Sequence, residues 1–86
     1  MKFELTATFK KKAKKLFRKD PQLRKHFIKQ FKIFEKNHQH PSLKLHKLKG
    51  KRSNEYAIWI KGNVRAVAIS ENRVYIFFTI ITHDEY

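Results

Sequence analysis

The sequence predicts an α+β fold, in the order β-α-α-β-β-β, in which a two-helix hairpin packs on one face of a small, mainly antiparallel, twisted sheet. Apolar residues recur at helical spacing in two basic segments of the first half of the chain. In the second half they alternate or run together in short segments between tight turns. The chain has 86 residues, so we expect a single domain over residues 1–86.

The N-terminal segment is expected to form a strand and then a helix. Phe3 and Leu5 alternate with polar residues over residues 2–6, which is typical of a strand with one buried side. Thr6 or Thr8 can cap the helix that follows, because a threonine side chain accepts a hydrogen bond from a backbone N–H of the first turn. Four apolar residues share one face of this helix: Phe9, Ala13, Leu16 and Phe17.

A second helix is expected to begin at Asp20-Pro21, since aspartate is a favourable capping residue and proline fits the first helical position. Its buried face repeats every three to four residues, and Ile28 lies beside that face. The residues of the face are Leu23, Phe27, Phe31 and Phe34. Both helices carry mainly lysine and arginine elsewhere, so the hairpin is expected to be apolar inside and basic outside.

The second half of the chain is expected to supply the rest of the sheet. After a loop at residues 37–42, the strand-like segments are residues 43–48, 55–61, 64–70 and 73–82. Gly62-Asn63 is suited to a type II′ hairpin turn, and Glu71-Asn72 to a second tight turn.

Side chains alternate between the two faces of a strand, and this alternation predicts which residues face the helices. In the last strand these are Val74, Ile76, Phe78 and Ile80. The other face of that strand receives Tyr75, Phe77, Thr79, Ile81 and His83. Lys44 and His46 are expected on this second face as well. Alternation alone does not place Arg65, and Trp59 is available to pack over Ala66 and Ala68.

The charge of the chain is large and unevenly distributed. The chain has 21 Lys+Arg and 7 Asp+Glu, a formal net charge of +14, and residues 1–52 hold 18 of the basic and 3 of the acidic side chains. Such a field implies a polyanionic partner, most often a nucleic acid, with a merely solvated surface as the alternative. Few glutamates stand four residues from the helical lysines, which favours a binding surface. The expected RNA-binding residues are Lys10, Lys11, Lys14, Lys15, Arg18, Lys44, Lys47, Lys49, Lys51 and Arg52.

The composition excludes several classes of function. The chain has no cysteine, which rules out a disulfide or a thiol nucleophile and fits a reducing, cytoplasmic location. No apolar run approaches the ~20 residues of a membrane span, and the N-terminus does not resemble a secretion signal. His38 and His40 lack a third ligand nearby, so we expect no metal site, and the chain is too short for a large cofactor.

Two histidines, an arginine and a tyrosine are the parts needed to cut RNA without a metal. The 2′-hydroxyl of RNA is the nucleophile, so an enzyme must supply a base, an acid for the leaving 5′-oxygen and a cation for the phosphorane. Histidine suits either proton role because its unperturbed pKa, ~6.5, lies near working pH. We expect His46 and His83 to be this pair, without assigning which is the base. Arg65 would hold the phosphate oxygens, and Tyr86 would orient or stack on a base.

Several short segments resemble the RelE/ParE superfamily of bacterial and archaeal toxins, in an order that extends over nearly the whole chain. They are His40-Pro41, Leu48-Lys49-Gly50, Tyr56, Val64-Arg65 and His83-Asp84-Glu85-Tyr86. The ribonuclease branch, closest to YafQ- and YoeB-like toxins, implies cleavage of mRNA in the ribosomal A site, inhibition of translation and silencing by a cognate antitoxin protein. The products would be a 2′,3′-cyclic phosphate or its 3′-phosphate and a 5′-hydroxyl.

The resemblance also implies a role for each candidate by its position. These roles are acid–base catalysis for His46, phosphate stabilisation for Arg65, and the C-terminal catalytic stretch for His83 and Tyr86. Two departures from the family pattern stand out. Ala57 and Trp59 occupy strand positions where RelE has lysines, so acid–base work would fall to the histidines. The spacing from His83 to Tyr86 is one residue shorter than is common in the YafQ-like group.

Two alternatives stay open at this point. A ParE-like toxin would have the same fold, no nuclease chemistry and DNA gyrase as its target, and a histidine pair with an arginine argues against it. A plain basic nucleic-acid-binding module would bind in a salt-sensitive manner and cut nothing. For a toxin, we expect an antitoxin to cover exposed apolar residues such as Tyr75 and Phe77.

Overall fold

The computed structural model describes residues 1–48 and 54–82 of the chain. The elements in chain order are β1 (Lys2–Leu5), α1 (Ala7–Lys19), α2 (Pro21–Lys36), the short 3-10 helix η1 (Pro41–Leu43), β2 (His46–Lys47), β3 (Glu55–Lys61), β4 (Val64–Glu71) and β5 (Val74–Ile81). The predicted α+β class is confirmed, and the five strands fall within or close to the five segments predicted as strands, one more than the order β-α-α-β-β-β counts. Five predicted site residues lie outside the described residues: Lys49, Lys51, Arg52, His83 and Tyr86.

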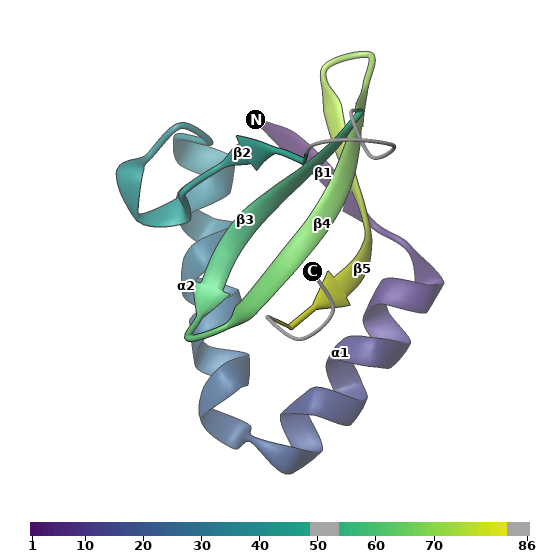
Figure 1. Ribbon diagram of the computed structural model, residues 1–86, viewed down its shortest axis with the longest axis vertical. Coiled ribbons are helices and arrows are strands. Elements are labelled where there is room, and N and C mark those ends of the chain that lie inside the picture. Colours follow the sequence, from purple (N-terminus) through teal and green to yellow (C-terminus); the bar gives the residue numbers. More distant parts are fainter. Residues whose placement is uncertain (49–53, 83–86) are drawn as a thin grey trace.

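The five strands form one sheet in the order β1-β5-β4-β3-β2, with the two helices as a hairpin on one face (Figure 1). β1 pairs in parallel with β5, and the other neighbours pair antiparallel. The first strand of the chain therefore lies beside the last one, at one edge of the sheet. In the described part of the chain, neither helix has the length and hydrophobicity needed to cross a membrane.

The helix boundaries follow from two capping side chains. The Thr6 hydroxyl accepts a hydrogen bond from the backbone N–H of Phe9 at 3.1 Å, which decides between the two threonines considered as caps. The Asp20 carboxylate accepts from the backbone N–H of Gln22 at 3.1 Å, and Pro21 occupies the first helical position. Asp20 ends α1 and caps α2, so a single residue makes the bend of the hairpin.

The core between the helices and the sheet is built largely from phenylalanine rings. Phe31 is central, with its ring centroid 4.9 Å from that of Phe77 and 5.0 Å from that of Phe3. All four residues predicted for the inner face of α2 are buried: Leu23, Phe27, Phe31 and Phe34. Removing such a ring typically costs 3–5 kcal/mol, so this cluster dominates the stability of a chain of this size.

The segment before β2 differs from the predicted strand over residues 43–48. Pro41 begins a 3-10 turn, and the His40 ring Nδ1 accepts a hydrogen bond from the Ser42 backbone N–H at 3.1 Å. Leu43, the last residue of this turn, is buried. Lys44 follows it and adopts the left-handed conformation with φ +48°. The apolar position was therefore predicted correctly, but proline makes a turn there rather than a strand.

A bulge shifts the register of the hairpin between β3 and β4. Trp59 pairs with Arg65 and Lys61 pairs with Val64, so Ile60 is the extra residue. In a regular two-residue hairpin Trp59 would stand opposite Ala66, where it would be available to pack over the alanines. The bulge instead puts Trp59 beside Arg65, while Ala66 and Ala68 face the helices.

A second bulge reverses the predicted faces in the first half of β5. Val67 pairs with Thr79 and Ala68 pairs with Phe77, so Phe78 is the extra residue. Ile80 faces the helices as predicted, but Tyr75 and Phe77 also belong to the helix-side core, only 8% and 1% exposed. The prediction that Val74, Ile76 and Phe78 fill that core, and that Tyr75 and Phe77 are exposed, was wrong. Burial raises the pKa of the Tyr75 phenol, which stays protonated.

Candidate functional site

The candidate site lies on the face of the sheet opposite the helices, which we call the outer face. Strand pairing sets two neighbouring rows of side chains across this face. The first row contains His46, Ala57, Val67 and Thr79. The second row contains Trp59, Arg65 and Ile81. His46 and Arg65, which lie far apart in the sequence, are therefore on the same face and in adjacent rows.

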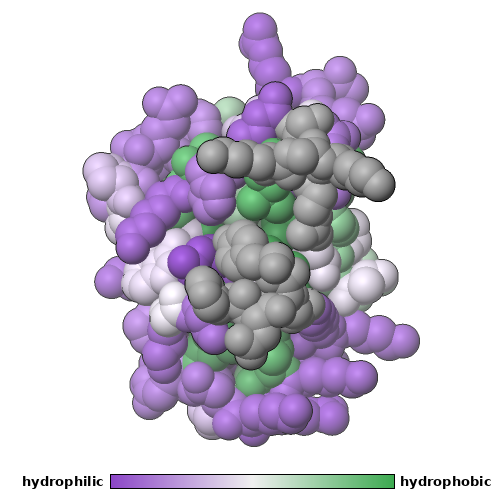
Figure 2. Space-filling view, viewed as in Figure 1, coloured by the Kyte–Doolittle hydropathy of each residue, from purple (hydrophilic) through white to green (hydrophobic). Residues whose placement is uncertain are grey.

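A small apolar cluster forms the floor of the outer face. Leu48, Ala57, Val67 and Ile81 are buried, and Phe78 packs against them. Figure 2 shows hydrophilic side chains around the margin of the view that has β3 and β4 in front, and patches of apolar side chains inside that margin. The bulge at Phe78 contributes to this floor, because it turns that ring away from the helix-side core.

His46 is exposed at the edge strand β2, and its ring is oriented by the backbone. Its Nδ1 lies 2.9 Å from the carbonyl oxygen of Lys44. A carbonyl oxygen can only accept, so Nδ1 carries a proton and the neutral ring has its lone pair on Nε2. The left-handed conformation of Lys44 places this carbonyl, and the result is an imidazole whose outward nitrogen can take or give a proton.

Arg65 is half-buried and held at the β3–β4 turn. Its Nη1 donates hydrogen bonds to the carbonyl oxygens of Gly62 at 3.1 Å and Val64 at 3.3 Å. Gly62 has φ +55°, which most side chains tolerate poorly. Strand geometry puts the Cα atoms of Arg65 and His46 about 12 Å apart, two strand spacings across and two residues along. Both side chains are long enough to reach a phosphodiester between them.

Two residues with a bearing on this site were missed by the sequence analysis. The Trp59 Nε1 donates to the Gly62 carbonyl at 2.9 Å, and the Lys44 ammonium lies 5.1 Å from the centre of the Trp59 ring. Gln30 of α2 is 3% exposed and donates through Nε2 to the carbonyls of Ser42 at 3.1 Å and Trp59 at 2.8 Å. Gln30 could have been noticed, because position 30 falls on the apolar face of its helix.

The predicted RNA-binding residues do not all lie on the outer face. Lys44 lies over Trp59, whereas Lys47 pairs with Tyr56 and so points to the opposite face at the sheet edge. Lys15 and Arg18 are exposed on α1. Lys10, Lys11 and Lys14 line a groove between the helices. Within residues 1–48 and 54–82, the predicted RNA-binding side chains therefore lie on several surfaces instead of forming one patch.

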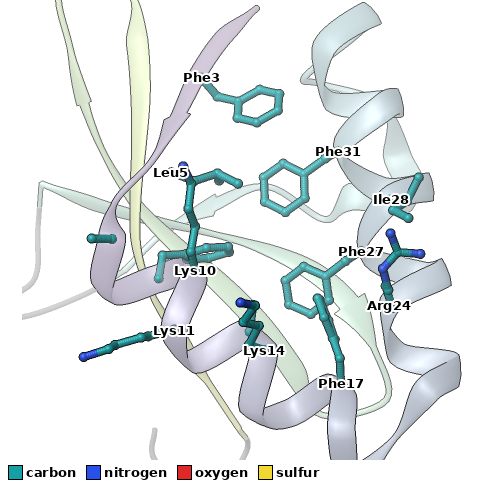
Figure 3. A pocket seen from close by; sticks show the side chains of 13 residues that line it. Phe3, Leu5, Lys10, Lys11, Lys14, Phe17, Arg24, Phe27, Ile28 and Phe31 are labelled. Carbon is teal, nitrogen blue, oxygen red and sulfur yellow. The ribbon is translucent and has the colours of Figure 1, made fainter.

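That groove is bounded by β1, α1 and α2 and has a volume of about 590 Å³ (Figure 3). Its floor is apolar, with Phe17, Phe27 and Phe31 pointing into the groove and Ile28 at its margin. Ile28 is 40% exposed, the largest apolar exposure among the big side chains that the structure describes. Basic side chains stand around this apolar floor: Lys10, Lys11, Lys14 and Arg24.

The two loop histidines have structural contacts. His38 packs its ring 6.0 Å from those of Phe34 and Tyr75, and His40 caps η1 as described above. Within residues 1–48 and 54–82, no group of three or more histidine, cysteine, aspartate or glutamate side chains is arranged to hold a metal ion.

Comparison with known proteins identifies the fold. No protein-family model matches the sequence, and no curated relative matches it. A copper-bound mutant toxin from Helicobacter pylori is 25% identical, with a TM-score of 0.71 over 99% of this chain and 97% of its own. YafQ from Escherichia coli is 16% identical, with a TM-score of 0.68 over 96% and 93%. YoeB in the YoeB–YefM complex from Staphylococcus aureus is 15% identical, with a TM-score of 0.73 over 96% and 97%. The chain therefore has the RelE-like fold of these solved toxins, which is the fold that the sequence resemblance predicted.

Proposed function

We propose that this chain is the toxin of a type II toxin–antitoxin pair and that it is a metal-independent endoribonuclease cleaving mRNA in the ribosomal A site. The observation that carries the proposal is the placement of His46 and Arg65 on one face of the sheet, in adjacent rows. Ile81, two residues before His83 in the chain, pairs with Arg65. The fold likeness to YafQ and YoeB and the net charge of +14 support the same function.

The proposed reaction uses the nucleotide's own 2′-hydroxyl. A base removes its proton as the oxygen attacks phosphorus, the bond from phosphorus to the 5′-oxygen breaks, and an acid protonates that leaving oxygen. His46 performs one of these transfers through Nε2, with Nδ1 anchored on Lys44, and His83 performs the other. Arg65 stabilises the added charge on the phosphorane. The products are a 2′,3′-cyclic phosphate, or the 3′-phosphate formed from it by hydrolysis, and a 5′-hydroxyl.

Inducible expression in bacteria, with primer extension on a translated mRNA, tests the function. We expect growth arrest and new 5′ ends within the coding region, carrying a hydroxyl that a polynucleotide kinase can label. The same transcript with its start codon removed is the control, and it should stay intact if cutting occurs in the ribosomal A site. DNA damage with intact mRNA would instead indicate a gyrase-directed toxin. Arrest-free growth with intact mRNA would indicate a plain nucleic-acid-binding module.

The partner that we propose is a small acidic antitoxin, and the groove between the helices is its docking site. The YoeB relative was crystallised with YefM, which supports an antitoxin partner. The groove joins an apolar floor to a basic margin, so it is complementary to an amphipathic segment with acidic flanks. Since Tyr75 and Phe77 are buried, this groove replaces them as the apolar surface that an antitoxin would cover.

Ile28→Lys is expected to weaken antitoxin binding at least about fivefold, because it removes exposed apolar contact area from the groove margin. Gln22→Lys is the matched control, since it adds the same charge to α2 outside the groove residues. Calorimetry with the acidic protein encoded next to this chain measures both affinities. Equal affinities for the two variants would place the antitoxin elsewhere, and cleavage by free Ile28→Lys should match that of the parent.

A further inference from the structure

We infer that Trp59, with Lys44, forms a nucleobase-stacking subsite on the outer face, for a base of single-stranded RNA next to the phosphate held by Arg65. Only the identity of the ligand as RNA rests on the proposed function, because the geometry around Trp59 by itself supports a base-stacking subsite. Its ligand is the aromatic face of a base, without preference for one base.

Trp59 and Arg65 are fixed side by side by one carbonyl group. They pair directly across β3 and β4, and the indole Nε1 and the guanidinium Nη1 both donate to the Gly62 oxygen, at 2.9 and 3.1 Å. The bulge at Ile60 creates this pair, since a regular hairpin would turn Arg65 toward the helix-side core. A ring with its edge anchored in this way is already oriented for stacking, so little conformational entropy is lost on binding.

Lys44 supplies a cation over the ring. Its ammonium lies 5.1 Å from the ring centre, and its left-handed backbone, at φ +48° and ψ +40°, is a conformation that a lysine rarely adopts. Such strain is found where surrounding structure and function require it. A long, mobile lysine can move from the ring to a neighbouring phosphate when a base takes its place.

The position of Trp59 relative to His46 suits a nucleotide. His46 pairs with Ala57, and Trp59 is two residues further along β3, so their Cα atoms are about 8 Å apart. Stacking on an aromatic side chain is a common source of affinity for single-stranded nucleic acids, since every base has a π face. Trp59 is half-buried and belongs to neither apolar cluster of the described residues, as expected of a ring that serves a ligand.

The fluorescence of the chain reports on this subsite directly, because Trp59 is its single tryptophan. The probe is a single-stranded DNA oligonucleotide, which lacks the 2′-hydroxyl and cannot be cut, and the control is an abasic strand of the same length and charge. We expect the base-containing strand to quench the tryptophan emission in parallel with its binding, measured by anisotropy. The abasic strand should bind through its phosphates and leave the emission unchanged. Absence of binding, or equal emission with both strands, would overturn the inference.

Two substitutions of Trp59 distinguish a role in base stacking from a purely structural role. Trp59→Phe and Trp59→Leu both lose the hydrogen bond to Gly62, but only the leucine variant loses the aromatic face. We expect Trp59→Leu to weaken binding of the base-containing strand about 5- to 20-fold and Trp59→Phe to change it less than about threefold. Both should bind the abasic strand like the parent. Equal loss in both variants would assign Trp59 a structural role, and if neither variant folds, the quenching of the parent chain decides.

The same data separate this inference from the proposed function. Base-dependent quenching without mRNA cleavage in cells would leave the subsite in place and remove the nuclease. Cleavage of mRNA with no base-dependent quenching would support the nuclease and rule out the stacking subsite.

Discussion

Replacing His46 with alanine is expected to lower the single-turnover rate of mRNA cleavage roughly 10²- to 10⁴-fold, because a positioned acid or base contributes about that much. The loss should appear in the chemical step rather than in RNA binding, since the role proposed for His46 is proton transfer, as either base or acid. The measurement is cleavage of a programmed mRNA by excess chain, on ribosomes if the cellular test shows that they are needed. The double variant His46→Ala with His83→Ala is expected to reach the background rate.

Two control variants make this result specific. His26→Ala removes an imidazole from α2, away from the outer face, and should leave the rate unchanged. His46→Asn keeps a side-chain N–H that can donate to the Lys44 carbonyl but lacks a basic ring nitrogen. If the role of His46 is proton transfer, the asparagine variant will be as slow as the alanine variant. Rates near that of the parent for His46→Asn would show that the ring only anchors the loop.

The elements with strong local signals were predictable from the sequence. Asp20-Pro21 marks the bend of the helical hairpin, and the spacing of the α2 phenylalanines marks its buried face. Residues 55–61 were predicted as a strand, and β3 has those bounds, because turn-forming residues flank it on both sides. In each case a few neighbouring residues determine the local structure.

The two bulges could not be predicted, because they depend on which residues pair across strands. Residues 74–81 are almost uniformly apolar, so nothing in their pattern shows where the alternation shifts at Phe78. The same holds for the bulge at Ile60, because the residues of β3 around it are compatible with either face of the sheet. The consequence for the site is direct. His46 and Arg65 could be named from the sequence, but the neighbourhood of Trp59, Arg65 and Gly62 follows only from the bulge.

Gln30→Leu is expected to lower the free energy of unfolding by about 2–4 kcal/mol, a large part of the 5–15 kcal/mol typical of a domain. The Gln30 amide donates to two carbonyls from a position that is 3% exposed, at Ser42 before β2 and at Trp59 in β3. Leucine fills a similar volume but leaves both carbonyls without this donor, and an unsatisfied buried polar group costs about 1–3 kcal/mol. Urea unfolding of the two chains measures the difference.

Gln22→Leu is the matched control, because the same substitution at an exposed position of α2 should change stability by less than about 0.5 kcal/mol. The effect of Gln30→Leu should extend to the site. Ser42 precedes Lys44, whose carbonyl orients His46, and Trp59 stands beside Arg65, so one amide of α2 holds both halves of the outer face in register. Under conditions where the variant is still folded, its cleavage rate should therefore fall, whereas Gln22→Leu cleaves like the parent. A midpoint and a rate equal to those of the parent would mean that water replaces the amide at both carbonyls and that the site does not depend on the helix beneath it.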